Sequence, residues 1–199
     1  MNAIIYDCEI IKAIPPQLQT GIKYCKGWRD FKNMGISVIG AYDYLENRYR
    51  VFMSDNFDEF QKLVDKRDKI IGFNSLAFDN KLCAANRIIV RDSKSYDLLA
   101  EVWKAKGLGS EFDIENSHRY LGLGLDKLAE VNLGLNKTGH GDLAPIQWQQ
   151  GKIGAVIDYC LTDVHLTKRL ISRILETGQL LDSHTESYGK LIKIPFFIK

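Results

Sequence analysis

Two acidic residues, Asp7 and Glu9, follow directly on a short apolar run near the start of the chain. The run predicts a buried strand over residues 3–8. Side chains two residues apart on a strand point to one face, so both carboxylates lie together while Cys8 points the other way. Paired oxygen donors at the edge of a core favour a hard divalent cation such as Mg²⁺ or Mn²⁺. Strand-end acids that merely face solvent are the alternative interpretation.

A third acid, Asp79, ends the string Asn74-Ser-Leu-Ala-Phe78-Asp79. A strand is expected over 69–74 and a helix over 76–87, which places Asp79 in the first helical turn. The helix dipole alone also favours an acid there. The Phe-Asp pair recurs at 57–58 and 112–113, and the Asp-x-Glu spacing recurs at 113–115. The position of Asp79 directly after a strand is therefore more informative than the dipeptide.

Tyr159 and Asp163 lie four residues apart in the longest helical pattern, over 151–177, and therefore share one face of that helix. The apolar positions of this segment predict that the helix packs inward. A buried carboxylate is costly without a partner. A metal ion would be one such partner, and a lysine or backbone donors are the alternative.

Taken in order along the chain, these motifs resemble the DEDD family of 3′→5′ exonucleases of the ribonuclease-H-like superfamily. The resemblance is to its tyrosine-bearing branch, called DEDDy. It rests on Asp7-Cys-Glu9, Asn74…Phe78-Asp79 and Tyr159-Cys-Leu-Thr-Asp163, and it spans most of the chain. The strings Ile71-Gly-Phe-Asn74 and Asp158-Tyr-Cys-Leu-Thr-Asp163-Val are similar to a prokaryotic and phage subgroup related to polymerase proofreading domains.

The resemblance implies a phosphodiesterase that uses two divalent cations, Mg²⁺ or Mn²⁺. The cations would be held by four acids: Asp7, Glu9, Asp79 and Asp163. Tyr159 would position the attacking water, and Asn74 and Phe78 would orient the terminal nucleotide. A core role for Phe78 is the alternative. The implied substrate is single-stranded nucleic acid, with DNA favoured over RNA. A polymerase or helicase partner is compatible with this resemblance, but no sequence feature indicates one.

Residues 11–35 form an insertion that is longer than the connection usual in the family, and it carries five basic residues against one acid. Lys26 and Trp28 within it are expected to contact a single strand, a cation serving the phosphates and a ring serving the bases. A loop that packs its aromatic rings on the body of the protein is the alternative. His140 lies in a glycine-rich stretch and is a further candidate for approaching a phosphate. Residues 187–199 form a basic tail with three lysines and no acid.

The order of predicted elements gives an α/β fold with a mixed sheet flanked by helices. The family resemblance implies that this sheet is ribonuclease-H-like. Strands are expected over 3–8, 36–44, 49–53 and 69–74, with short strands or strand ends over 88–90 and 96–98. Helices are expected over 57–67, 76–87, 125–132 and 151–177, the last ended by Gly178. The length of 199 residues fits a single exonuclease domain over 1–199.

The composition, 45% hydrophobic and 26% charged, is typical of a soluble globular protein. No apolar run reaches the roughly 20 residues of a membrane span, and no signal peptide is visible, so a cytoplasmic location is expected. The four cysteines lack metal-binding spacing, which indicates reduced thiols. The net charge of +2 neither requires nor excludes nucleic acid. Two other functions are considered: a catalytically silent nucleic-acid-binding module, and a ribonuclease-H-like endonuclease or resolvase.

Overall fold

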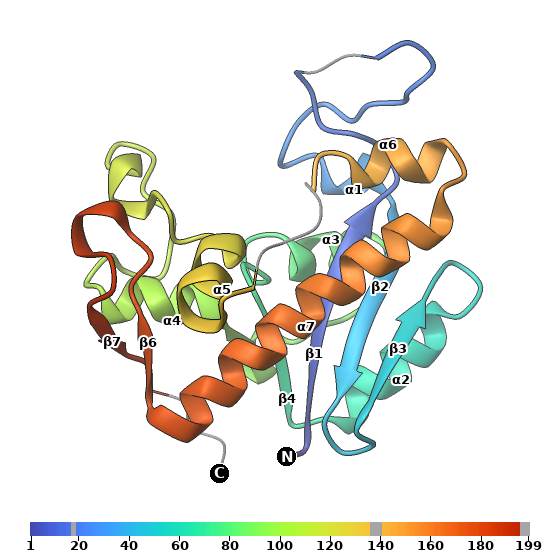
Figure 1. Cartoon of the computed structure of the whole chain (residues 1–199). Helices are drawn as coiled ribbons and strands as arrows, with labels where there is room; N and C mark the ends of the chain where they lie inside the picture. Colours follow the sequence, from blue (N-terminus) through green and yellow to red (C-terminus); the bar gives the residue numbers. More distant parts are fainter. Residues whose placement is uncertain (17–18, 136–140, 196–199) are drawn as a thin grey trace.

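The computed structural model describes residues 1–16, 19–135 and 141–195, and its centre is a five-stranded mixed sheet (Figure 1). The strands are β1 (Ala3–Ile10), β2 (Ile36–Asp43), β3 (Arg48–Phe52), β4 (Lys69–Gly72) and β5 (Ser95–Asp97), in the order β3-β2-β1-β4-β5. β1 is antiparallel to β2 and parallel to β4, β2 is antiparallel to β3, and β4 is parallel to β5. The predicted α/β mixed sheet flanked by helices is confirmed.

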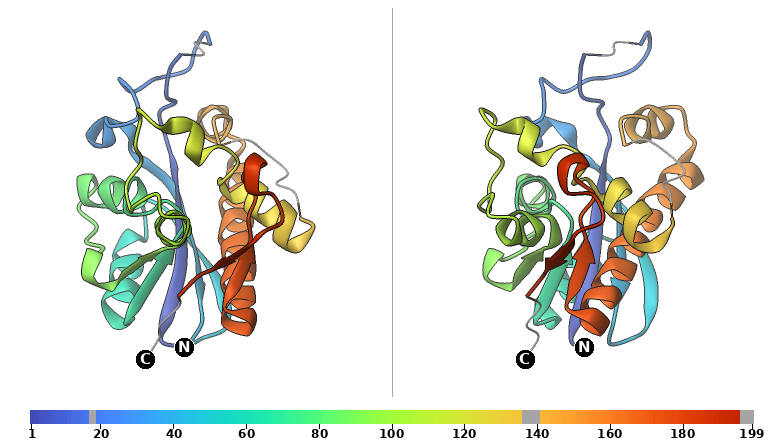
Figure 2. Two further views of the ribbon diagram at one scale, coloured as in Figure 1. Left: turned by 90° about the vertical axis from the view of Figure 1, so that its left-hand side faces the viewer. Right: turned by 60° about the vertical axis from the view of Figure 1, so that its left-hand side comes forward.

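Helices cover both faces of this sheet (Figures 1 and 2). One face carries α2 (Phe57–Lys66) and α3 (Asp79–Ala85), and the long α7 (Ile153–Thr177) crosses the other face against β1 and β2. The remaining helices are α1 (Phe31–Met34), α4 (Leu98–Ala105), α5 (Leu125–Leu133) and α6 (Ala144–Gln149). Among the described helices, none is both long and apolar enough to cross a membrane.

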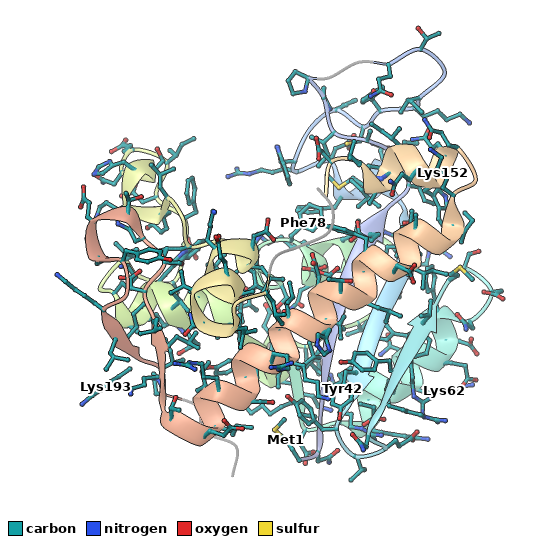
Figure 3. All side chains as sticks on the ribbon, viewed as in Figure 1. Met1, Tyr42, Lys62, Phe78, Lys152 and Lys193 are labelled. Carbon is teal, nitrogen blue, oxygen red and sulfur yellow. The ribbon has the colours of Figure 1, made fainter. Side chains whose placement is uncertain are left out.

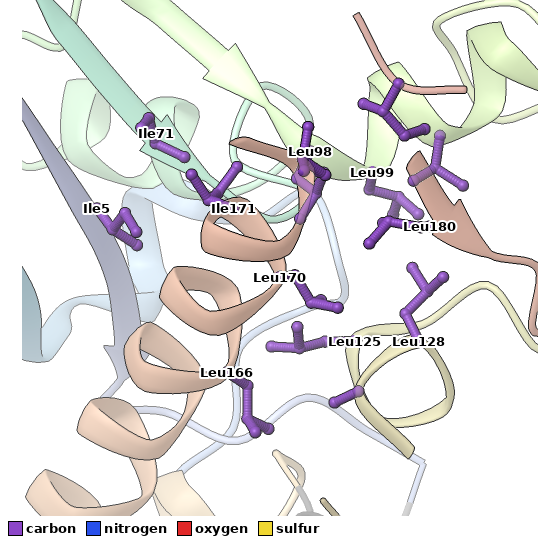
Figure 4. Close-up of a cluster of buried hydrophobic side chains, with 14 of the residues drawn as sticks. Ile5, Ile71, Leu98, Leu99, Leu125, Leu128, Leu166, Leu170, Ile171 and Leu180 are labelled. Carbon is purple, nitrogen blue, oxygen red and sulfur yellow. The ribbon is translucent and has the colours of Figure 1, made fainter. Parts of the chain in front are cut away.

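Alternation along β1 sends its side chains into two separate cores. Ile4 and Tyr6 pack with α2 and α3, while Ile5 packs on the side of α7. Figure 4 shows Ile5 beside Ile171 of α7 in this second core, which extends to α5. The same alternation continues beyond the apolar part of β1, so Asp7 and Glu9 emerge on the face that α7 covers.

Gly40 on β2 allows α7 to lie unusually close to the sheet. A Cβ atom at this position would meet Sγ of Cys160 at 2.9 Å and methyl groups of Leu161 and Val164 at 3.4 Å each. The amide of Gly40 donates a hydrogen bond to that same sulfur over 3.2 Å. Glycine is therefore needed here for a close approach.

Several predicted elements are corrected by the structure. The predicted strand over 88–90 is wrong: these residues are in no regular element, and Ile88 and Val90 pack against the α3 side while Ile89 is exposed. Three apolar residues are too short a run to define a strand. Strand β5 ends at Asp97 rather than at residue 98, because the Asp97 carboxylate accepts hydrogen bonds from the amides of Leu99 and Ala100 and thereby caps α4.

Helices α1, α4 and α6 and two strands after α7 were not predicted. Helix α6 occupies residues between the glycine-rich stretch and α7. A hairpin of β6 (Gln179–Leu181) and β7 (Leu191–Lys193) follows α7, so the predicted basic tail contributes a paired strand. Leu180 and Ile192 of this hairpin are buried in the core beneath α4 and α5. The segment belongs to the packed structure at least as far as the last described residues.

Candidate active site

A cleft of about 780 Å³ opens at the carboxyl end of β1. Since β1 and β4 are parallel, the residues that follow each strand meet at this same edge of the sheet. Eight of the nine predicted site residues line the cleft: Asp7, Glu9, Trp28, Asn74, Phe78, Asp79, Tyr159 and Asp163. Lys26 is exposed and lies outside the lining residues. His140 lies outside the described residues.

The sheet register fixes Asp7 and Glu9 on the floor of the cleft. Asp7 pairs with Gly40 and Glu9 with Val38, both on β2, and the register shifts directly after Glu9. Asp7 is half-buried and Glu9 is buried. Ligand atoms of these two carboxylates and the sulfur of Cys160 all lie within 4.8 Å of one another, a spacing suited to a metal ion.

Cys160 was not predicted to belong to this site. Its thiol contacts the carbonyl oxygen of Asp7 at 3.4 Å and its Oδ2 at 3.6 Å. Burial, with the charges of Asp7 and Glu9, raises the pKa of the Cys160 thiol well above its ordinary range. A protonated thiol is a poor ligand for hard cations. Cys160 is therefore a buried residue beside the site whose thiol donates a hydrogen bond to Asp7.

Asp79 reaches the cleft from the opposite face of the sheet, at the first residue of α3. Its Oδ1 accepts a hydrogen bond of 3.0 Å from the amide of Cys8, the residue between Asp7 and Glu9. Burial, followed by the nearby Cys83, raises the pKa of the Asp79 carboxyl well above its ordinary range. The hydrogen bond ties the start of α3 to the strand that carries the other acids.

Helix α7 supplies Tyr159 and Asp163, one turn apart, to the cleft. Asp163 is buried, because this face of α7 lies against β1 and β2, and Tyr159 is half-buried. Gly141 approaches the tyrosine closely, since a Cβ atom there would lie 3.2 Å from the phenol oxygen. A residue larger than glycine at position 141 would crowd the hydroxyl.

Asp97 positions the loop between β4 and α3 and was missed as a site residue. Its carboxylate accepts hydrogen bonds from the amides of Asn74 (2.8 Å) and Leu76 (3.0 Å). These bonds hold Asn74 in a left-handed conformation with φ of 63°, which asparagine tolerates better than most residues. The position of Asp97 between a strand and a helix is the sequence signal that could have identified it as a cap.

Phe78 is the centre of an aromatic group on the wall of the cleft. Its ring meets Trp28 edge-on with centroids 6.1 Å apart, and Phe31 with centroids 5.6 Å apart. Figure 3 shows Phe78 near the upper end of β1, beneath the projecting insertion. Phe78 is half-buried and lines the cleft, so it combines packing with access to the cleft.

The second Asp-x-Glu motif, at Asp113 and Glu115, lies in an exposed loop. Asp113 accepts hydrogen bonds from the backbone amides of Glu115 and Asn116, which makes it the start of a local turn. It is not among the residues that line the cleft. The strand that precedes Asp7 therefore distinguishes the two motifs, as the sequence indicated.

Charges along the cleft are strongly unbalanced. Six of its described lining residues are acidic: Asp7, Glu9, Asp79, Asp126, Asp142 and Asp163. Lys127 is the one basic side chain among the described lining residues. Its Nζ forms an ion pair with Oε2 of Glu130 at 2.8 Å. Clustered carboxylates repel one another unless cations or protons offset their charge. The oxygen donors present therefore fit hard divalent cations.

No protein-family model matches the sequence, and a search of curated proteins finds no relative. Among solved structures, the chain is similar to the family B DNA polymerase from the hyperthermophilic archaeon Pyrobaculum calidifontis, with a TM-score of 0.53 and 17% sequence identity. The match covers 87% of this chain but only 24% of the polymerase chain. At this identity the similarity is one of fold. The chain thus shares its α/β architecture, a mixed sheet flanked by helices, with about a quarter of a DNA polymerase.

Proposed function

We propose that this protein is a metal-dependent 3′→5′ exonuclease that hydrolyses single-stranded DNA. The observation that carries the proposal is the meeting of four acids and a tyrosine in one cleft, from β1, α3 and α7. The match between their order along the chain and the DEDDy motifs supports it. The fold shared with a DNA polymerase favours DNA over RNA as the substrate.

In this proposal two divalent cations, Mg²⁺ or Mn²⁺, are held by the carboxylates of Asp7, Glu9, Asp79 and Asp163. Bound cations of this kind activate water and offset negative charge on a phosphodiester. The excess of acids over bases in the cleft supports their presence, because a polyanionic strand is repelled by uncompensated carboxylates. The DEDDy assignment and the number of cations rest on the motif resemblance.

The protein's own groups would bind and orient the reactants. The phenol hydroxyl of Tyr159, which can both donate and accept a hydrogen bond, would hold the attacking water. Asn74 and Phe78 would orient the terminal nucleotide, because both line the cleft beside Asp79. The hydrogen bonds of Asp97 fix the loop that carries Asn74 and so would limit movement of the reacting end.

The decisive test is digestion of 5′-labelled single-stranded DNA with Mg²⁺ or Mn²⁺, with duplex DNA and RNA in parallel. We expect progressive shortening from the 3′ end with release of mononucleotides, and none in excess chelator. Asp7→Ala or Asp163→Ala should abolish this activity while the protein stays folded, since removing one of several clustered acids relieves repulsion. Asp113→Ala is the matched control, because it alters the exposed Asp-x-Glu motif, and it should retain full activity.

Two results would contradict the proposal. A wild-type rate of hydrolysis in Asp7→Ala would show that this acid takes no part in the reaction. Cleavage of circular single-stranded DNA by the wild type would indicate an endonuclease. Metal-dependent binding of DNA without any hydrolysis would instead indicate a catalytically silent module.

A further inference from the structure

Trp28 is an exposed aromatic residue on the wall of the cleft. Its exposed fraction is 69%, although burial of so large an apolar side chain normally stabilises a protein. It lines the same cleft as the acids, and its only described aromatic neighbour is the ring of Phe78, met edge-on. This contact leaves much of the indole uncovered. If the aromatic rings of the insertion only packed on the body of the protein, the contact of Phe31 with Phe78 would be explained, but the exposure of Trp28 would not.

The insertion that carries Trp28 is held in place by α6. The side-chain amide of Gln149 donates to the carbonyl oxygens of Ile11 (2.9 Å) and Lys23 (3.0 Å), and its oxygen accepts from the amide of Lys23 (2.7 Å). A backbone bridge between Ala13 and Tyr24 closes the base of the loop. The insertion is thus held at Ile11 and Ala13 on one side and at Lys23 and Tyr24 on the other.

A second set of contacts fixes the turn at Trp28 itself. Asp30 accepts a hydrogen bond from the amide of Lys26 (2.8 Å), and its own amide donates to the carbonyl oxygen of Gly27 (3.0 Å). Phe31, three residues after the tryptophan, packs on Phe78. Phe78 precedes Asp79 directly, so the ring contact between Trp28 and Phe78 links the insertion to the residue beside one of the acids. A pre-positioned ring loses little entropy when a ligand stacks on it.

We propose that Trp28 is the stacking platform for a base at the unpaired 3′ end of the substrate, and that it selects unpaired over paired ends. The inference rests on the proposed exonuclease function and assigns substrate selection to the insertion. Within a duplex, both faces of an internal base are covered by neighbouring base pairs and its edge is paired. An unpaired terminal base is free to lie on an indole, an interaction that tolerates every base type.

The experiment measures binding of a single-stranded oligothymidylate whose 3′-terminal linkages are phosphorothioates, which slow hydrolysis, in the presence of Mg²⁺. Quenching of tryptophan fluorescence reports stacking, and a 5′-fluorophore anisotropy signal reports binding independently. We expect Trp28→Ala to raise Kd, and KM on the normal oligothymidylate, about tenfold, the scale of one base–aromatic contact. Trp28→Phe should keep most of the affinity but lose the quenching. Binding to a blunt duplex of equal length should change little.

Removing the bases from the two 3′-terminal nucleotides tests the contact itself. The wild type should bind this abasic strand about tenfold more weakly than the normal strand. Trp28→Ala should bind the two strands equally well, because the variant and the abasic strand remove the same interaction. Tyr188→Ala is the matched control, since Tyr188 is 65% exposed and lies outside the cleft-lining residues. It should change neither Kd nor quenching.

The outcomes separate this inference from the proposed function. Equal Kd values for wild type and Trp28→Ala, in an enzyme that degrades single strands, would overturn the platform and leave the exonuclease intact. Additive losses for the variant and the abasic strand would also overturn it. If the wild type hydrolyses nothing, the exonuclease fails, whereas loss of affinity in Trp28→Ala with the non-additive pattern would still support the stacking site.

Discussion

At the scale of single residues, the proposed role of Tyr159 in orienting water differs from the metal-binding role proposed for the neighbouring acids. It shares a face of α7 with Asp163, and its hydroxyl lies close to the backbone at Gly141. We expect Tyr159→Phe to lower kcat about 100-fold, the low end of the contribution of a positioned proton-handling group. Metal affinity, measured by titration calorimetry with Mn²⁺, should barely change, because the carboxylates remain.

Tyr49→Phe provides a matched control for this change. The hydroxyl of Tyr49 is bonded to His165 of α7 at 2.7 Å, and neither residue lines the cleft. Loss of that hydroxyl should leave kcat unchanged. A collapse of metal affinity in Tyr159→Phe, rather than of turnover, would show that the tyrosine supports the acids instead of the water.

At the scale of elements, the seam between β2 and α7 determines whether the acids of two elements meet. Gly40→Ala places a methyl group 2.9 Å from the sulfur of Cys160, closer than real contacts allow, so the Cys160 side chain or the helix that carries it must shift. We expect a loss of about 1–3 kcal/mol in the free energy of unfolding, typical of an overpacked core. Activity should fall as well, because α7 carries Tyr159 and Asp163. Denaturant melts and the nuclease assay measure the two effects.

Two variants sharpen this prediction. Gly154→Ala, on α7, adds a methyl group that meets nothing within 4 Å, and it should leave stability equal or slightly higher. Adding Cys160→Ala to Gly40→Ala removes the clashing sulfur and should restore part of the lost stability. Wild-type stability in Gly40→Ala alone would mean that the seam yields more easily than the contact distances indicate.

At the scale of the whole molecule, the end of the sheet opposite the cleft contributes stability rather than chemistry. Asp43 pairs with Ile4 near the start of β1 and is fully buried. Arg67 binds its carboxylate through two hydrogen bonds, of 3.0 Å from Nε and 2.6 Å from Nη2. Burial by itself raises the pKa of Asp43, but the hydrogen bond and charge of Arg67, together with hydrogen bonds from the backbone of Leu45 and Glu46, outweigh it, so the pKa lies below its ordinary value of 3.8.

A carboxyl whose pKa is lowered by folding adds stability at pH values above its ordinary pKa and loses that contribution as pH falls through the folded value. We therefore expect the free energy of unfolding to fall as the pH decreases below about 4, the range where unfolded aspartates titrate. Asp43→Asn should cost about 3 kcal/mol at pH 7, because buried Arg67 loses the carboxylate that binds it through two hydrogen bonds and keeps only Glu46, 3.7 Å from Nη2, as an acidic neighbour among the described residues. Denaturant melts from pH 7 down to pH 3 measure both quantities.

The difference between wild type and Asp43→Asn should shrink toward low pH, which separates this pair from the other acids of the chain. Nuclease activity of the folded fraction should be unchanged, since the pair lies at the far end of β1. A difference in stability that is constant across pH would show that the charge of Asp43 contributes nothing.

Much of this architecture was readable from the sequence, because local periodicity determines it. The apolar run before Asp7, the helical stripe around Tyr159 and the helix-ending Gly178 each depend on neighbours a few residues away. The spacing of Asp7 and Glu9 alone placed them on one face of a strand, as the structure has them. Short runs such as 88–90 were misjudged, because three residues do not define a period.

The remaining features were decided by tertiary structure. Cys160 reaches Gly40 from 120 positions away, and Gln149 reaches Lys23 from 126 positions away. Such contacts depend on sheet register and on where a helix crosses the sheet, neither of which is encoded in any local pattern. The sequence by itself determined which acids could act together. Only packing of the whole chain decided that a thiol lies against Asp7 and that Trp28 stands exposed at the cleft, because both depend on how distant elements meet.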